Sequence, residues 1–97
     1  MVVGISVLEL HLPQARSLKD KRRVVKSLIE RLHARHRVSI AETGFNDLHQ
    51  RAEIGIALVA TSASEVEKLL ESLRREADAE PEAVVTRWEP QILEELQ

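Results

Sequence analysis

The most regular pattern in the sequence is the alternation of apolar side chains between Arg51 and Thr61. Five apolar residues fall on one face of this segment when it is extended: Ala52, Ile54, Ile56, Leu58 and Ala60. Because side chains of a β-strand point alternately to opposite faces, the pattern predicts a strand with one buried face. We expect it to be a central strand of a sheet.

The segments around this strand have equally clear local patterns. Further strands are expected at 2–12 and 37–43, with amphipathic helices at 17–36 and 62–80. The first helix begins with Ser17 and an acid three residues later, which is a capping box with the shorter acid. The second offers two overlapping capping boxes, one starting at Ser62 and one at Ser64.

The C-terminal part is expected to hold a short strand at 83–89, ended by Pro90, and a candidate helical turn at 91–97. The resulting order predicts an α+β fold, a ferredoxin-like βαββαβ sandwich with a four-stranded antiparallel sheet and two helices on one face. Ninety-seven residues are enough for one core. Residues 1–97 are therefore expected to form a single ferredoxin-like domain.

The composition fits a globular protein, with 43% apolar and 31% charged residues. The absence of cysteine excludes disulfides, thiolate metal sites and cysteine nucleophiles. The first twelve residues lack a basic lead-in and a cleavage site, and no run approaches the roughly 20 apolar residues that span a bilayer. We therefore expect a cytoplasmic protein that has no membrane partner.

Residues 2–12 carry apolar side chains on both faces of the predicted strand, and a helical layer can cover only one of them. The second face, with Val3, Ile5 and Val7, would be joined by Ala57 and Val59 of the central strand. Exposed apolar area tends to mark an interface. We expect a partner subunit of a homo-oligomer or the tail at 91–97 to cover this face.

Positive charge is concentrated in one part of the chain, since residues 11–37 hold nine Lys or Arg residues against two acids. Cations are unfavourable at a helix N-terminus, which already carries partial positive charge and free N–H groups. A cluster there predicts an anion-binding or RNA-binding site; the alternative is a solvated basic face. The candidate residues are Arg16, Lys19, Lys21, Arg22, Arg23 and Lys26.

A second polar cluster lies in the connection before the central strand. Its candidate residues are Glu42, Asp47, Gln50 and Arg51, with His49 and Glu53 nearby. Carboxylates beside His and Arg are able to transfer protons. The spacing fixes no catalytic geometry, so the preferred interpretation is a polar hairpin in which Arg51 pairs with Glu9, Glu53 or Asp47. No catalytic residue is predicted.

Several function classes are disfavoured by missing motifs. The sequence contains no P-loop, no dinucleotide-binding glycine motif and no nucleophile elbow, and its four histidines lack a metal-ligand spacing. No metal and no cofactor are therefore expected. An acylphosphatase would need a phosphate-wrapping loop, and residues 13–16 hold an arginine but no glycine. Neither central strand carries an aromatic side chain, so bound RNA would be contacted through its phosphates.

Two blocks of the sequence resemble the YlxP-like family, a bacterial domain of unknown function. The first block is Leu10–Pro13 with Ser17–Arg22, and the second is Ser39–Glu42 with Asp47–Gly55. The chain differs from the family at Leu48-His49, where a Trp more often precedes the Gln. The resemblance implies a ferredoxin-like fold and no established activity. Genes of this family often lie near those of translation initiation and ribosome maturation factors, so the resemblance also implies an association with RNA or the ribosome.

Three functions remain open at this level. The leading hypothesis is a non-enzymatic binding module that contacts RNA or a ribosomal surface through its basic first helix. The alternatives are a homo-oligomeric regulatory domain that binds a small anion, and a small phosphate-directed hydrolase.

Overall fold

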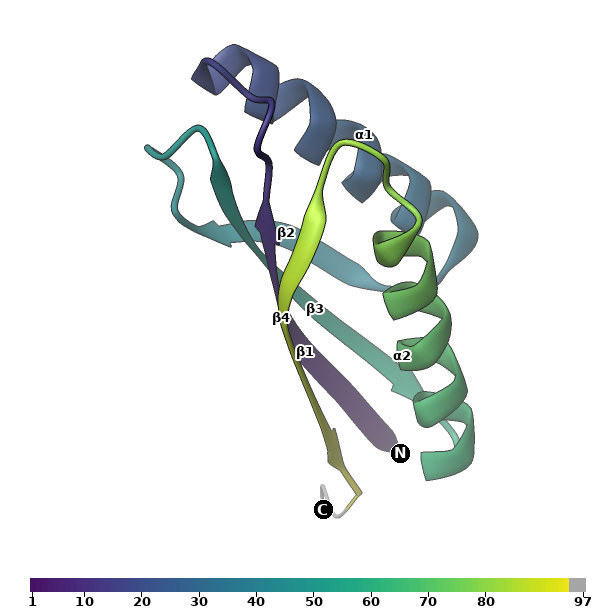
Figure 1. Cartoon of the computed structure of the whole chain (residues 1–97). Helices are drawn as coiled ribbons and strands as arrows, with labels where there is room; N and C mark the ends of the chain where they lie inside the picture. Colours follow the sequence, from purple (N-terminus) through teal and green to yellow (C-terminus); the bar gives the residue numbers. More distant parts are fainter. Residues whose placement is uncertain (95–97) are drawn as a thin grey trace.

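The structure is a computed structural model that describes residues 1–94 (Figure 1). Six elements follow one another along the chain, in the βαββαβ order that the sequence predicts. They are β1 (Val2–His11), α1 (Leu18–Arg35), β2 (Ser39–Gly44), β3 (Arg51–Ala60), α2 (Ala63–Asp78) and β4 (Val84–Leu93).

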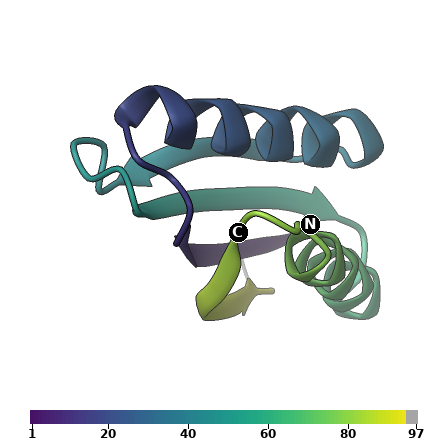
Figure 2. The ribbon, with the colours of Figure 1, turned by 45° about the horizontal axis from the view of Figure 1, so that its top comes forward.

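The four strands form one antiparallel sheet in the order β2-β3-β1-β4. Both helices cover the same face of this sheet, as Figures 1 and 2 show. Helix α1 packs mainly against β2, whereas α2 packs mainly against β1 and β4. This arrangement confirms the predicted ferredoxin-like sandwich, in which the two central strands are β1 and β3.

The core lies between the helices and the even-numbered side chains of the two central strands. Leu8 of β1 pairs with Ile54 of β3, and both side chains are fully buried. The helices contribute Leu28 and Leu32 from α1 and Leu73 from α2. The alternation predicted for residues 51–61 is therefore correct and sets which face meets the helices.

The first turn of each helix is capped as its sequence predicts. The Oγ of Ser17 accepts a hydrogen bond from the backbone N–H of Asp20 at 3.0 Å. The Asp20 carboxylate accepts one from the backbone N–H of Arg16 at 2.9 Å. Of the two boxes proposed for α2, the one formed by Ser62 and Glu65 is present.

The prediction that Pro90 ends the last strand is wrong. Strand β4 continues through Pro90 to Leu93, and Pro90 lies opposite Ser6 of β1. Because β4 is an edge strand, a proline is tolerated when its missing N–H would point away from the sheet. The candidate helical turn is therefore wrong for residues 91–94, since 91–93 belong to β4 and Glu94 is in no helix or strand, and the rest of it, 95–97, lies outside the described residues.

Candidate anion-binding surface

The cations of α1 and its approach differ in what surrounds them. Lys21 is buried, while Arg23, Arg31 and Arg35 form ion pairs with acids that follow in the chain. The remaining predicted cations are exposed and form no ion pair within residues 1–94: Arg16, Lys19, Arg22 and Lys26. The predicted anion-binding set therefore contains residues with very different surroundings.

Lys21 has a side chain that is 0% exposed. Its ammonium donates hydrogen bonds to the backbone carbonyl of Phe45 at 2.7 Å and to that of Arg51 at 3.1 Å. Glu42 Oε2 lies 2.9 Å from the same nitrogen, as an ion pair without hydrogen-bond geometry. Lys21 cannot reach an external anion, which corrects its place in the predicted set.

The sequence contained a signal for this burial. Position 21 precedes the buried residues Val25, Leu28 and Leu32 at helical spacing, so it lies on the apolar side of α1. The basic run around it favoured an exposed interpretation. Glu42, predicted in the polar loop cluster, lies on the helix-facing side of β2 and serves this buried contact instead.

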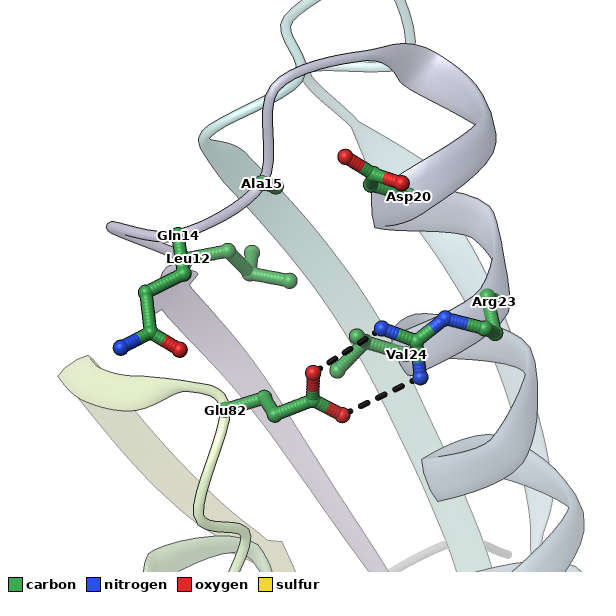
Figure 3. A pocket seen from close by; sticks show the side chains of 7 residues that line it. All are labelled: Leu12, Gln14, Ala15, Asp20, Arg23, Val24 and Glu82. Atoms are coloured by element: carbon green, nitrogen blue, oxygen red, sulfur yellow. Dashed lines mark hydrogen bonds and ion pairs between the residues drawn. The ribbon is translucent and has the colours of Figure 1, made fainter.

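Arg23 pairs with Glu82 through its two terminal guanidinium nitrogens, Nη1 and Nη2, at 3.2 and 2.9 Å (Figure 3). This arginine lowers the pKa of the Glu82 carboxyl, and Glu82 raises the pKa of Arg23. The pair borders a hollow of about 230 Å³ that is also lined by Asp20, Gln14 and Leu12. Two carboxylates against one guanidinium make this hollow unsuitable for an anion.

Two further arginines join α1 to the later part of the chain. Arg31 contacts Glu80, whose other carboxylate oxygen accepts the Glu82 backbone N–H at 3.0 Å. Arg35 contacts Glu76 at 2.8 Å. Burial raises the pKa of the Glu76 carboxyl, but hydrogen bonds from His36 and Arg35 outweigh it and lower that pKa overall. These ion pairs link α1 to α2 and to the segment that follows it.

Lys19, Arg22 and Lys26 lie on one side of α1, because residues three and four apart are neighbours on a helix. At a rise of 1.5 Å per residue they extend over about 10 Å. Arg16 lies just before the helix. Only Lys19 belongs to the first turn, where Asp20 offsets its charge. We call Arg16, Lys19, Arg22 and Lys26 the α1 stripe.

The loop cluster predicted at 42–51 is used for positioning. Gln50 Nε2 donates to the backbone carbonyls of Pro13 and Ala15 at 3.4 and 3.3 Å, which joins two loops at the N-terminal end of α1. Arg51 pairs with Glu9 at 3.1 Å, one of the three acids predicted as possible partners, and its guanidinium lies 3.9 Å above the Phe45 ring. Exposed Asp47, Gln50 and Arg51 line a hollow of about 350 Å³, with His11 and His49.

The face of the sheet opposite the helices is not covered by any described residue. We call it the open sheet face; its apolar members include Val3, Ile5, Val7, Ala57 and Val59. At one end Glu9 lies between Arg51 and Arg87, and its pKa is lowered mainly by the Arg87 hydrogen bond. Arg87 was missed as a partner of Glu9 because local patterns do not give the register between β1 and β4.

Within the described range of 1–94, no group of three or more histidine, aspartate or glutamate side chains is placed to hold a metal ion. None of the helices described is long and apolar enough to cross a membrane.

The sheet order and the two helices on one face define a ferredoxin-like α+β protein. The chain belongs to a protein family of unknown function, DUF503, whose model matches residues 3–90. It is 37% identical over 90 residues to the uncharacterized protein YlxP of Bacillus subtilis (strain 168), covering 91% of this chain and 98% of that protein. This confirms the resemblance to the YlxP-like family.

A solved structure supports the fold alone. The chain resembles a de novo designed protein with a ferredoxin fold, determined by solution NMR, with a TM-score of 0.50 and 15% sequence identity. The similarity covers all of this chain (100%) and 88% of the designed protein.

Proposed function

We propose that the chain is a non-enzymatic, cytoplasmic module that binds RNA, free or on a ribosomal surface, through phosphates held by the α1 stripe. One observation carries this proposal. The four stripe cations are exposed and have no carboxylate partner among the described residues. The other arginines of α1, in contrast, form ion pairs with Glu76, Glu80 and Glu82. Exposed Lys and Arg side chains that neutralise phosphates supply most of sequence-independent binding.

The position of the aromatic residues supports phosphate contact over base stacking. Within the described residues, the open sheet face carries no Phe, Tyr or Trp side chain. Phe45 lies in a loop under Arg51, and Trp88 faces the helix side of β4. Proteins that stack bases on a sheet place aromatic side chains on that surface. Binding through the α1 stripe is therefore expected to depend little on base sequence.

Replacing Lys19, Arg22 and Lys26 together with Ala is expected to weaken RNA binding and its salt dependence. Each lost contact to a single strand reduces the slope of log affinity against log salt by about 0.7, so the triple variant loses about 2. The measurement is a titration of a fluorescent single-stranded RNA at several salt concentrations. Thermal unfolding of the variant is expected to match the parent, since none of the three side chains is in an ion pair.

The charge-matched control replaces three other cations with Ala: Arg37, which follows α1, and Lys68 and Arg75 of α2. All three are exposed and outside the ion pairs of residues 1–94. This control is expected to keep the parental slope. An equal decrease in both variants would assign binding to total charge, and an unchanged slope in the triple variant would refute the proposal.

A second candidate function is homo-oligomeric assembly through the open sheet face. Val59 is 61% exposed on this face. It lies opposite Val3 and on the same side of β3 as Ala57, and both of these residues are half-buried. At the other end of this face, the charges of Glu9, Arg51, Arg87 and Glu89 neutralise one another. A partly apolar face whose charges largely cancel can meet a second copy of itself with little net repulsion. The regulatory, small-anion-binding alternative would use such an assembly.

Sedimentation equilibrium tests this assembly. Val59→Glu is expected to shift the protein toward monomer, because it places unpaired negative charge in the proposed contact. Leu48→Glu is the control, since Leu48 is 47% exposed but lies in the loop outside this face. A parent that stays monomeric at all concentrations, or a control with the same effect, would exclude the open sheet face as the interface.

A further inference from the structure

A groove of about 260 Å³ lies between α2 and β4, on the opposite part of the helical layer from the α1 stripe. Its floor and walls are apolar, and two carboxylates stand at its rim. The lining residues are Glu67, Leu70, Glu71, Trp88, Pro90 and Ile92. Neither the RNA proposal nor the assembly through the open sheet face uses this groove.

Trp88 gives the groove much of its apolar surface, and part of its side chain stays exposed to solvent. It lies opposite Leu8 in the sheet and faces the helical layer, where it packs against the core. Because β4 is an edge strand, no further strand covers its outer side, and Trp88 and Ile92 are only half-buried. A half-buried indole beside aliphatic side chains is favourable for contact with another apolar side chain.

The rim of the groove is negatively charged. Glu67 and Glu71 are four residues apart on α2, so they lie on one side of the helix and repel each other weakly. Both are exposed, and neither forms an ion pair within the part of the chain that the structure describes. Arg74 is paired with Asp78, and the exposed Lys68 and Arg75 of the same helix form no ion pair with either acid among the described residues. A cationic ligand would relieve this repulsion.

We propose that this groove binds a cationic amphipathic segment of a partner protein. One aliphatic side chain of that segment inserts between Trp88 and Leu70, and flanking Lys or Arg residues contact Glu67 and Glu71. The segment docks by its side chains, because Pro90 removes a backbone donor from β4 and so weakens strand addition along this edge. This site is acidic and the α1 stripe is basic. The groove therefore favours a basic protein partner, whereas the stripe favours an anionic one.

The chain contains one tryptophan, so intrinsic fluorescence reports on this groove directly. The probe is a short peptide with the repeated sequence Lys-Leu-Leu-Lys, which has no aromatic residue of its own. It is expected to shift the Trp88 emission to shorter wavelength with saturation. Peptides with repeated Lys-Ser-Ser-Lys or Glu-Leu-Leu-Glu sequences are expected to produce no shift, since each lacks one of the two required chemistries.

Glu67→Gln with Glu71→Gln is expected to weaken binding of the Lys-Leu-Leu-Lys peptide about three- to tenfold at low salt, as two exposed ion pairs are lost. The control, Glu30→Gln with Asp47→Asn, removes the same charge from exposed positions away from the groove and is expected to bind as the parent does. Equal weakening in the control, or equal binding of an uncharged Ser-Leu-Leu-Ser peptide, would overturn the proposal.

Two further outcomes separate this inference from the functions proposed above. An emission shift that depends on protein concentration alone would place a second copy in the groove and refute a heterologous partner. The Glu67→Gln, Glu71→Gln variant is expected to keep the salt slope of RNA binding, so failure of either proposal leaves the other standing.

Discussion

Lys21→Met is expected to lower the free energy of unfolding by about 3–5 kcal/mol, the cost of removing one partner from a buried ion pair. Methionine fills a similar volume but leaves Glu42 without its counter-ion and the carbonyls of Phe45 and Arg51 without a donor. Urea unfolding followed by circular dichroism measures this change. Lys19→Met is the control, since that neighbour is exposed, and a change within about 0.5 kcal/mol is expected.

A double-mutant cycle with Glu42→Gln tests the reason for the effect. Once the glutamate is neutral, loss of the ammonium no longer leaves an uncompensated charge, and a coupling of about 0.5–3 kcal/mol is expected. The carbonyls still lack a donor, so the double variant remains less stable than the parent. Effects of Lys21→Met and Glu42→Gln that simply add would contradict the buried pair.

Lys21 also holds an unusual backbone conformation. Phe45 has a φ of 58°, in the left-handed region, at a position without glycine. Such a conformation costs about 1–3 kcal/mol and persists only where its surroundings fix it. Here the Lys21 hydrogen bond holds the carbonyl, and Arg51 covers the ring. Lys21 therefore organises the loop at 44–50.

Gly4→Ala is expected to destabilise the fold by about 1–3 kcal/mol, because the added methyl group overpacks the core. A Cβ at this position would lie 2.5 Å from Val66 Cγ1 and 3.2 Å from Leu58 Cδ1. Val66 is fully buried on α2, so the helix must move away from β1. The change in midpoint of urea unfolding measures the cost.

Val66→Ala supplies a rescue for this variant, since it removes the methyl group that the new Cβ would meet. The double variant is expected to be more stable than the sum of the two single effects predicts. Gly55→Ala is a useful comparison: its Cβ would meet the Thr43 methyl at 2.9 Å, on an exposed side chain that can rotate. An effect of Gly55→Ala as large as that of Gly4→Ala would contradict the overpacking explanation.

Local patterns were sufficient for most of the fold. The alternation in β3, the capping residues Ser17 and Ser62 and the order of elements all depend on near neighbours, and each is confirmed. The end of β4 was missed because tolerance of Pro90 depends on the position of its strand at the sheet edge, which only the complete topology defines.

The candidate site was harder to predict, because charge does not reveal its partner. Lys21 and Arg22 are adjacent cations, yet one is buried and the other is exposed. Their difference depends on helical phase and on acceptors supplied by β2 and the loop at 44–50. Arg23 likewise depends on Glu82, which is far away in the sequence. The sequence offered three acids as the partner of Arg51, and the structure selects Glu9, which lies on the same face of the neighbouring strand.

The pairing of Val3 with Leu93 has a practical consequence for immobilising the protein on a surface. The start of β1 and the end of β4 lie at one end of the sheet, whereas the loops at 13–16 and 44–50 lie at the other (Figure 1). A surface tether joined at either end of the chain would hold the first turns of α1 toward the solution. The same tether would crowd the nearby end of β4, so immobilised protein suits RNA capture and protein free in solution suits peptide titration.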